Sequence, residues 1–347
     1  MIVVFGGYGT FGSQVARALA AGKAGPIVVA GRDAARARDF AAALPGSAHR
    51  GIAADVAGGA ALVEALTGAT VAINCAGPFS SLGTGLLDAC LAAGCHYVDI
   101  ADDRAYARTV RDYGARFAAR ALTCAYGCSS LPALSGALAI SLGGAPPERA
   151  RVTLFIGNAN PKGAAAVRSA VGLIGRAIEA PQGPLRGFAD GERVELPAPF
   201  GRRTVYNFES PEYDLFPLLL GARAVSVKVG FEMRVGTFLF ATLARLGSGY
   251  GAATARLLGA AGGLLRSAGH SGGVVMTELF DAGGTRRAAA ISAPTDGQRM
   301  AALPAAFVAE ALRAGPAPRG AQTAYEVLGA EELLRKMVAA GYKITRS

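Results

Sequence analysis

A glycine-rich turn between an apolar run and an amphipathic stretch constrains this chain more than any other feature. Residues 1–5 are apolar and predict a buried strand, and residues 13–20 predict a helix. Three of the glycines between them have the G-x-G-x-x-G spacing, which permits a tight turn, close approach of a pyrophosphate, and packing of helix on strand. The phosphates would meet free N–H groups at the helix N-terminus. We therefore predict that a dinucleotide contacts Gly7, Tyr8, Gly9, Thr10, Phe11 and Gly12.

The end of the next predicted strand bears on the choice between NAD and NADP. Residues 26–30 read as that strand, and Gly31, Arg32 and Asp33 follow it. An acidic residue in this place usually holds the ribose 2′-hydroxyl of NAD, whereas a guanidinium suits a 2′-phosphate by charge and by its fork of donors. The sequence thus favours NADP, with Gly31 and Arg32 in the site. Two alternatives remain: Arg32 is a solvated strand-end residue, or Asp33 serves a 2′-hydroxyl.

Strands and helices continue to alternate as far as residue 126. Helices are expected over 34–44, 83–93 and 104–120, and strands over 51–54, 70–74, 95–100 and 122–126. This alternation predicts an α/β fold, a Rossmann-type doubly wound parallel sheet. Asp55, at a strand end, would reach the adenine or cap the following helix. The small residues after the fourth strand would let the backbone approach the nicotinamide half of the cofactor.

The pattern changes near residue 149. Longer, partly alternating strands are expected over 151–156, 203–208, 223–231, 273–280 and 285–292, with helices over 164–179 and 298–314. They predict a second, α+β domain for substrate binding and dimerisation. We place the domains at 1–127, 128–318 and 319–347, the last being a C-terminal helix that returns to the Rossmann domain.

Composition narrows the class of protein. The five cysteines are an odd number without paired C-x-x-C spacing, which argues for a reducing compartment and against a zinc site. No secretory leader precedes the first strand, so we expect a cytoplasmic protein. The net charge of +10 arises from scattered arginines, without a basic stripe interleaved with aromatic residues or a nucleic-acid-binding motif. We therefore expect no nucleic-acid partner.

Residues 236–268 form an apolar segment with arginines at near-regular intervals. Those arginines would lie in or near hydrocarbon if the segment crossed a bilayer. A helical hairpin that covers the substrate pocket is the preferred interpretation. Peripheral contact with a membrane surface is the alternative.

Together these motifs resemble the saccharopine dehydrogenase-like oxidoreductases, which are named for their NADP-binding domain. The resemblance is carried by residues 6–12, 30–32, 73–79, 96–100 and 127–132, and it is good over roughly the first 135 residues. It implies a Rossmann domain, an inserted α+β domain, a C-terminal helix that packs back, and often a homodimer. It also implies that the nicotinamide faces Cys75, Ala76, Gly77, Pro78, Phe79 and Asp99. The family spans dehydrogenases of secondary amines and lipid-related reductases, so the resemblance does not name the substrate.

Three residues are candidates for catalysis. Asp99 ends a strand whose tip would face the cofactor, where a carboxylate transfers protons or caps the next helix. Ser129 and Ser130 open a predicted helix and would hold a substrate carboxylate or cap that helix. Cys128 offers a rival mechanism, a thiolate nucleophile of an aldehyde dehydrogenase, but this needs a histidine base and the chain has only three histidines.

We predict an NADP-dependent oxidoreductase that transfers hydride between NADPH and a C=N, C=O or activated C=C bond of a small or lipid-like substrate. A short-chain dehydrogenase is disfavoured because no tyrosine has a lysine four residues on. The alternative from another class is a non-catalytic NADP-binding sensor or membrane-associated scaffold. It would bind the cofactor without turnover.

Overall fold

The computed structural model describes residues 1–46, 48–161, 163–264 and 269–347. The chain forms two compact units. The first comprises Met1–Ser129 and Ala301–Gly329, and the second comprises Ser130–Met300 and Ala330–Ser347. Each unit is described by itself below. The boundary near residue 129 lies close to the expected boundary after residue 127. The C-terminal third is divided differently, because residues 301–329 belong to the first unit and residues 330–347 to the second.

The first unit is built on a seven-stranded parallel sheet with the order β15-β6-β5-β4-β1-β2-β3. Without β15 this is the strand order of a dinucleotide-binding Rossmann fold, which confirms the predicted fold class. The direction of winding reverses between β1 and β4, so their carboxyl ends border the crevice where such folds bind ligands. The seven strands are β1 Ile2–Phe5, β2 Ile27–Gly31, β3 Arg50–Ala53, β4 Val71–Asn74, β5 His96–Asp99, β6 Thr123–Ala125 and β15 Gly320–Gln322.

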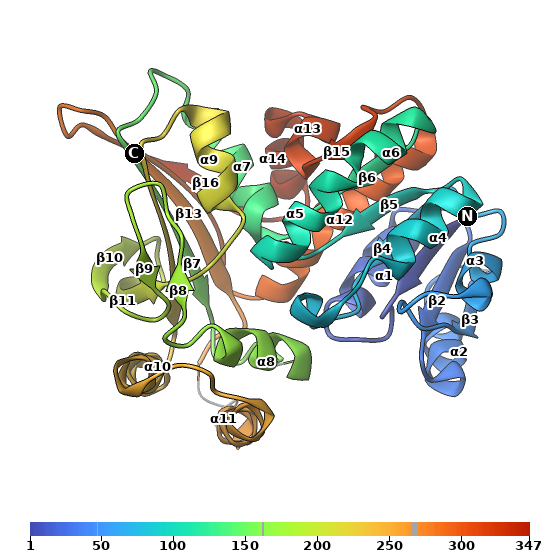
Figure 1. Cartoon of the computed structure of the whole chain (residues 1–347), viewed down its shortest axis with the longest axis horizontal. Helices are drawn as coiled ribbons and strands as arrows, with labels where there is room; N and C mark the ends of the chain where they lie inside the picture. The colour runs from blue at the N-terminus through green and yellow to red at the C-terminus, as the bar shows by residue number, and fades with distance from the viewer. Residues whose placement is uncertain (47, 162, 265–268) are drawn as a thin grey trace. The chain divides into compact units, whose positions relative to one another are not determined.

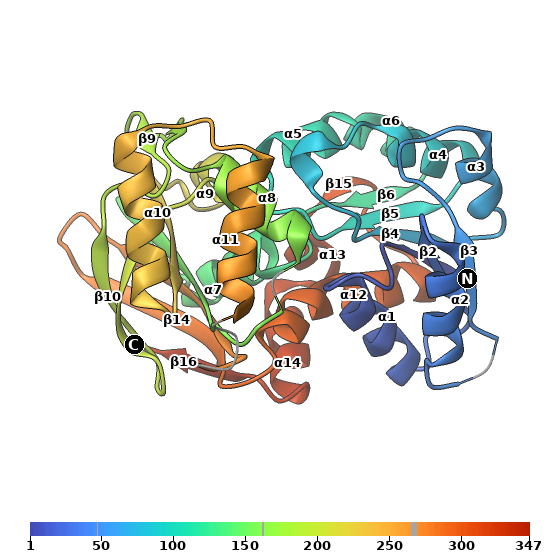
Figure 2. The same cartoon turned by 90° about the horizontal axis from the view of Figure 1, so that it is seen from below.

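Helices cover both faces of this sheet, as right-handed crossovers between parallel strands require. One face carries α1 Gly12–Ala21, α2 Ala34–Ala42 and α12 Gly297–Ala314 (Figure 2). The other carries α3 Ala60–Ala65, α4 Gly85–Ala93, α5 Arg104–Asp112 and α6 Gly114–Ala119. The short elements η1 Phe79–Ser81 and α13 Ala324–Leu328 complete the unit.

The helix expected over 104–120 is two helices, and the short strand β15 was not predicted. The two observations are related, because a Cβ on Gly114, between α5 and α6, would lie 2.9 Å from the side chain of Ala321. Gly114 therefore leaves room for β15 to pair with β6. A three-residue strand that follows a proline-rich connector carries too little periodicity to be read from sequence.

The second unit contains a seven-stranded mixed sheet with the order β10-β11-β12-β7-β13-β14-β16. Only β12 and β7 are parallel, and the other neighbours are antiparallel. The α+β character of this unit is confirmed. The five predicted strands correspond to β7, β11, β12, β13 and β14. The strands of this unit are β7 Arg149–Ile156, β8 Ala177–Ile178, β9 Leu185–Arg186, β10 Glu192–Leu196, β11 Gly201–Asn207, β12 Ala224–Phe231, β13 Gly273–Phe280, β14 Arg286–Ala293 and β16 Lys343–Arg346.

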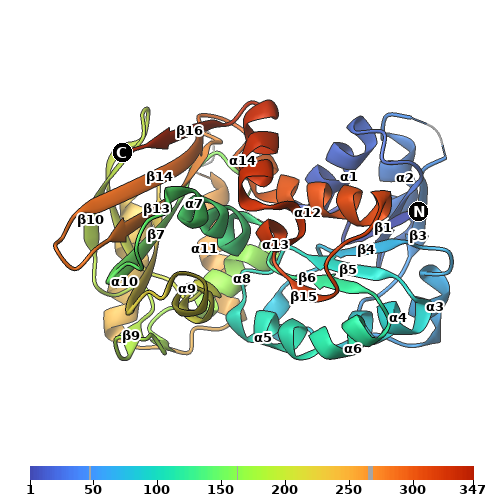
Figure 3. The same cartoon turned by 90° about the horizontal axis from the view of Figure 1, so that it is seen from above.

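The helices of the second unit differ from prediction at two places. The helix expected over 164–179 ends early, at Gly172. The C-terminal helix α14 belongs to the second unit, where it packs against α7 and leads into β16, and it does not join the Rossmann unit as expected. Its apolar stripe is equally compatible with either partner, so only the fold decides. These helices are η2 Ser130–Leu134, α7 Ser135–Leu142, α8 Ala164–Gly172, α9 Glu212–Leu220, α10 Arg234–Leu246, α11 Ala252–Leu264 and α14 Ala330–Ala339 (Figures 1 and 3).

The apolar segment 236–268 contributes α10 and α11, so over the described residues it is helical, as expected. Residues 265–268 lie outside the described residues. That this pair of helices covers a substrate pocket stays a prediction. Among the described residues, no helix is both long enough and apolar enough to cross a membrane.

Candidate cofactor site

The glycine loop joins β1 to α1 with the backbone of Gly6 in the left-handed region, at φ +68°. A Cβ on Gly12 would lie 2.2 Å from the carbonyl oxygen of Gly6, so the start of α1 fits against the turn only as glycine. Among the described residues, the N–H groups of Tyr8, Thr10 and Phe11 have no backbone acceptor. Free N–H groups at the N-terminus of a ten-residue helix suit a pyrophosphate by hydrogen bonding and by the helix dipole.

The loop after β4 lies directly against this turn. A Cβ on Gly6 would come within 2.9 Å of the carbonyl carbon of Cys75, and the N–H of Cys75 donates to the oxygen of Phe5 at 2.9 Å. The carboxyl ends of β1 and β4 are therefore in contact at the point where the winding reverses. Ala76, Gly77 and Pro78 follow as partly or fully exposed residues, and Phe79 turns inward to be buried.

Asn74 fixes the start of that loop, a role that sequence reasoning missed. Its buried side chain accepts a hydrogen bond from the N–H of Ala76 at 3.1 Å, and its amide nitrogen donates to the hydroxyls of Tyr97 and Tyr106, both at 3.3 Å. The two hydroxyls are 2.9 Å apart. The ring of Tyr106 lies 5.3 Å from that of Phe79. A buried asparagine with every polar atom engaged holds one loop conformation.

The end of β2 presents a small aromatic and cationic cluster. Tyr8 lies over Gly31, where a Cβ would come 2.4 Å from its ring, and its hydroxyl accepts from the N–H of Asp33 at 2.9 Å. The guanidinium of Arg36, from α2, lies over the Tyr8 ring, 4.7 Å from its centre. Arg32 is exposed beside them.

The carboxylate of Asp33 already has a structural partner. It caps α2, where Oδ1 accepts from the N–H of Arg36 at 3.0 Å. The sequence left Asp33 open as a ligand of a 2′-hydroxyl, and this engagement argues against that alternative. Arg36 lies four residues after Arg32, in the first turn of α2, and sequence reasoning overlooked this second arginine.

Asp55 stands exposed at the end of β3, as expected. Its Oδ1 accepts from the N–H of Ala57 at 3.0 Å, which makes a local turn, while the helix α3 starts at Ala60 with Gly59 as its N-cap. Asp55 therefore does not cap that helix. The hydrogen bond in this turn uses only Oδ1, so the expected contact of Asp55 with adenine stays a prediction.

Asp99 is fully buried at the end of β5. Its Oδ1 accepts from the N–H groups of Ala101 at 2.9 Å and Gly127 at 2.8 Å, while Oδ2 has no hydrogen-bond partner among the described residues. Burial raises the pKa of Asp99 to about 7, although the two N–H groups lower it. The expected capping of the next helix is made instead by Asp103, which accepts from the N–H of Tyr106. Asp99 thus ties the end of β5 to the loop after β6.

Asp102, three residues further on, is more accessible than Asp99. It is partly exposed, and desolvation raises its pKa to about 6. Sequence reasoning missed Asp102 because it lies three residues beyond the end of β5.

Ser129, Ser130 and Cys128 lie in a buried stretch that leads from β6 into η2 and α7. Ser129 and Ser130 are each less than a tenth exposed. Cys128 is fully buried, and burial raises the pKa of its thiol well above the ordinary value, with a further increase from the charge of Asp99. A buried thiol with a raised pKa is not a nucleophile at neutral pH, so the structure opposes the aldehyde dehydrogenase alternative.

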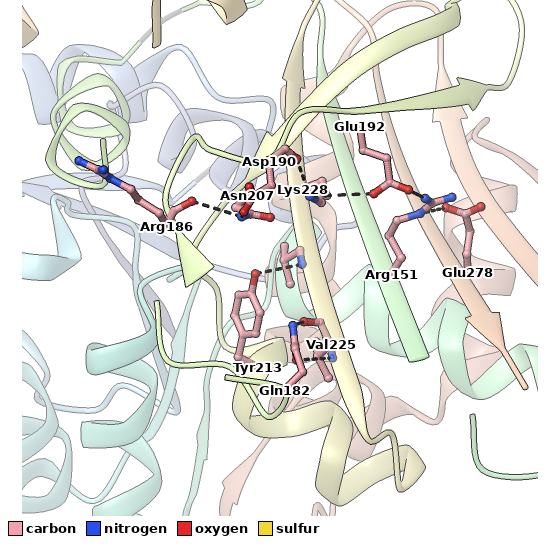
Figure 4. A network of polar contacts seen from close by, with 11 residues as sticks. Arg151, Gln182, Arg186, Asp190, Glu192, Asn207, Tyr213, Val225, Lys228 and Glu278 are labelled. Atoms are coloured by element: carbon pink, nitrogen blue, oxygen red, sulfur yellow. Dashed lines mark hydrogen bonds and ion pairs between the residues drawn. The ribbon is translucent and has the colours of Figure 1, made fainter. Parts of the chain in front are cut away.

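The second unit holds a buried polar network on its sheet (Figure 4). Arg151 bridges Glu278, at 2.6 Å, and Glu192, and the ammonium of Lys228 donates to the carbonyl oxygen of Asp190 at 2.8 Å. Register explains the grouping, because Arg151 on β7 stands opposite Glu278 on β13. Desolvation lowers the pKa of Lys228 to about 8. These ion pairs join strands of the sheet. Among the described residues, no group of three His, Cys, Asp or Glu side chains could hold a metal ion.

A parallel sheet of Rossmann order, a glycine loop with free N–H groups and a cationic cluster at the end of β2 define the class: an NAD(P)-dependent oxidoreductase with a nicotinamide dinucleotide as cofactor and a small-molecule substrate. Sequence comparison supports this class. Residues 2–125 match the family described as the saccharopine dehydrogenase NADP binding domain. The predicted resemblance is confirmed. No curated protein sequence matches the chain.

One solved structure shows the same fold over the whole chain. Apo saccharopine dehydrogenase (L-Glu forming) from Saccharomyces cerevisiae aligns with a TM-score of 0.65 at 12% identity and covers 100% of this chain and 99% of that one. A mutant meso-dapdh from Clostridium tetani, solved with DAP, aligns with a TM-score of 0.44 at 13% identity, with 96% and 98% covered. The yeast enzyme shares the two-part architecture, and at this identity the likeness concerns the fold alone.

Proposed function

We propose that the chain uses NADPH to reduce, or NADP⁺ to oxidise, a C=N, C=O or activated C=C bond of a small or lipid-like substrate. The observation that carries this proposal is the cluster at the end of β2, where Asp33 is engaged as a helix cap, the guanidinium of Arg36 lies over Tyr8 and Arg32 is exposed next to Asp33 in the chain. A 2′-phosphate would meet two guanidinium groups there, and a 2′-hydroxyl would find no free carboxylate.

The cofactor residues follow from the cradle described above. We assign the pyrophosphate to the N–H groups of the glycine loop, the adenosine half to Gly31, Arg32, Arg36 and Asp55, and the nicotinamide half to the loop from Cys75 to Phe79. The cofactor, when bound, supplies or accepts a hydride at its nicotinamide ring. The chain's own part is to bind and orient that ring and to handle one proton.

In the reductive direction, the hydride goes to the carbon of the substrate double bond and the proton goes to its nitrogen, oxygen or second carbon. We assign proton transfer to Asp102 and not to Asp99. Asp99 is inaccessible and has its Oδ1 fixed by Ala101 and Gly127, so we give it a positioning role. Ser129 and Ser130 remain candidates for a contact with a polar group of the substrate. The homodimer and the cytoplasmic location likewise remain proposals that rest on the resemblance and on the sequence.

Titration of NADPH and NADH, followed by nicotinamide fluorescence at fixed salt, tests the cofactor assignment. Wild type should bind NADPH more tightly than NADH, and Arg32→Ala and Arg36→Ala should each weaken NADPH binding by about 1.5–3 kcal/mol, the range for a charge-assisted hydrogen bond. NADH affinity should not change. Arg38→Ala is the matched control, because Arg38 is exposed on the same helix two residues from Arg36 and so points elsewhere. Equal affinity for the two cofactors would refute the NADP preference.

Oxidation of NADPH in the presence of imines, ketones and enones, including acyl-chain versions, tests the reaction. Turnover of one class identifies the bond. Tight binding of NADPH without turnover of any class would instead support the non-catalytic sensor.

A further inference from the structure

The outer surface of α10 and α11 is apolar in a way that the fold of the second unit does not require. Phe238 and Leu246 on α10 are 64% and 77% exposed, and Leu257 on α11 is 70% exposed. Leu239 is also exposed. Together these four are the majority of the large apolar side chains exposed among the described residues. The two helices run beside each other along one side of the unit (Figures 1 and 2).

The inner surfaces of the same helices are already packed against the core of the unit. Phe240 and Leu243 of α10 pack against the buried cluster that contains Phe188, Val229 and Ala255. The ring of Phe188 lies 4.9 Å from that of Phe240. A surface helix normally places polar residues opposite its core stripe. Because α10 is apolar on both sides, its outer side is suited to a second apolar environment.

The charges carried by the helices of this surface and by the neighbouring α8 are of one sign. The helices α8, α10 and α11 together contain four arginines and no carboxylate, and Arg168, Arg245 and Arg256 are exposed. On α10, Arg245 follows Phe238 by seven residues and therefore lies along the same line of the helix. Exposed Phe and Leu with arginines beside them are the composition of helices that lie in the interface of an anionic bilayer.

We propose that α10 and α11 dock this protein on an anionic membrane surface, with Phe238, Leu239, Leu246 and Leu257 in the acyl boundary and Arg245 and Arg256 among lipid phosphates. A second copy of the chain is the less suitable occupant. A two-fold interface through this surface would bring like arginines together without any carboxylate from these helices to compensate them. The proposal goes beyond the oxidoreductase function and does not depend on it.

Co-sedimentation with vesicles tests the docking surface. The full chain should bind phosphatidylcholine vesicles that contain phosphatidylserine and bind pure phosphatidylcholine vesicles much more weakly. Raising the salt concentration should weaken the binding, because screening acts on the arginine contacts. Replacing Arg245 and Arg256 by glutamine should lower the affinity about fivefold per arginine and flatten the salt dependence. Phe238→Ser with Leu257→Ser should lower the affinity roughly tenfold or more and keep the salt dependence.

Leu218→Ser is the matched control, since Leu218 is 73% exposed on α9, outside this surface, and its variant should bind vesicles as wild type does. Thermal unfolding and NADPH titration of each variant establish that it is folded, so a failed cofactor assignment is recognised separately. Light scattering after size exclusion measures the oligomeric state. Absence of vesicle binding by folded wild type, or equal binding to both vesicle types, would overturn the proposal, as would conversion of a dimer to a monomer by Phe238→Ser.

Discussion

The hydroxyl of Tyr8 accepts a hydrogen bond from the N–H of Asp33 at 2.9 Å, which joins the glycine loop after β1 to the start of α2. The glycine loop and the cluster at the end of β2 are thus held together by one side chain. The contact depends on Gly31, because any Cβ there would enter the Tyr8 ring.

We expect Gly31→Ala to displace the Tyr8 ring and with it the stacked guanidinium of Arg36. NADPH affinity should fall by about 1–2 kcal/mol, the size of one lost charge-assisted contact, while the free energy of unfolding changes by about 1 kcal/mol or less because Tyr8 is partly exposed. Fluorescence titration and thermal unfolding measure the two effects. Gly83→Ala is the control, since a Cβ there meets nothing within 4 Å. Unchanged NADPH affinity in Gly31→Ala would show that Tyr8 is not part of the site.

Asn74→Ala should loosen the loop that starts at Cys75. The N–H of Ala76 and the hydroxyls of Tyr97 and Tyr106 lose their hydrogen bonds to Asn74, which costs about 1–3 kcal/mol of stability. The variant should also raise the Kd of NADPH. Tyr106→Phe, which removes one hydroxyl and keeps the ring against Phe79, should have the smaller effect on both quantities. If the two variants are equally stable and bind NADPH as wild type does, the network does not position the loop.

Asp99→Asn separates a positioning role from proton transfer. Because burial raises the pKa of Asp99 from 3.8 to about 7, the folded state holds more protons than the unfolded state between these values, and stability falls as pH rises through this window. Asparagine can accept from Ala101 and Gly127 without ionising. The variant should therefore lose that pH dependence in unfolding experiments and keep activity within about tenfold. A loss of kcat of about 10²–10⁴ would instead make Asp99 the proton donor.

Asp102→Asn should affect catalysis more than stability. With its pKa raised to about 6, Asp102 is protonated below pH 6, so a reductive kcat that needs its proton should decrease as pH rises above 6. The variant should lower kcat by about 10²–10⁴ and abolish that limb of the pH profile. A profile that keeps the limb in Asp102→Asn would assign the proton to another group.

Because of Lys228, we expect the free energy of unfolding of the second unit to depend on pH in the alkaline range. Because desolvation lowers its pKa from 10.5 to about 8, the unfolded state binds more protons than the folded state between these values, and the free energy of unfolding should increase as pH rises through this window. Lys228→Met should remove this slope. Urea unfolding at several pH values measures it, and a wild-type stability that is constant from pH 8 to 10 would contradict the expectation.

The sequence by itself determined the alternating strands and helices of the Rossmann sheet, the glycine loop and the place of Arg32. These features are local: periodicity of 2 or 3.6 residues marks the elements, and the turn needs glycines at fixed spacing. The strands β7, β11, β12, β13 and β14 were also readable, because each is seven or eight residues long and bounded by turn residues.

Only the tertiary structure decided which groups meet. The sequence left Asp99 open as a proton donor or a helix cap, but the structure engages it with the N–H of Gly127, 28 residues further along the chain. Asp33, left open as a ligand of a 2′-hydroxyl, caps α2 through a local contact with Arg36. Arg36 and Asn74 gained their places from packing against Tyr8 and Tyr97. The apolar stripe of α14 did not name its partner, since a stripe specifies that a face is buried and not what covers it. Pairing of β16 with β14 settled that the helix completes the second unit.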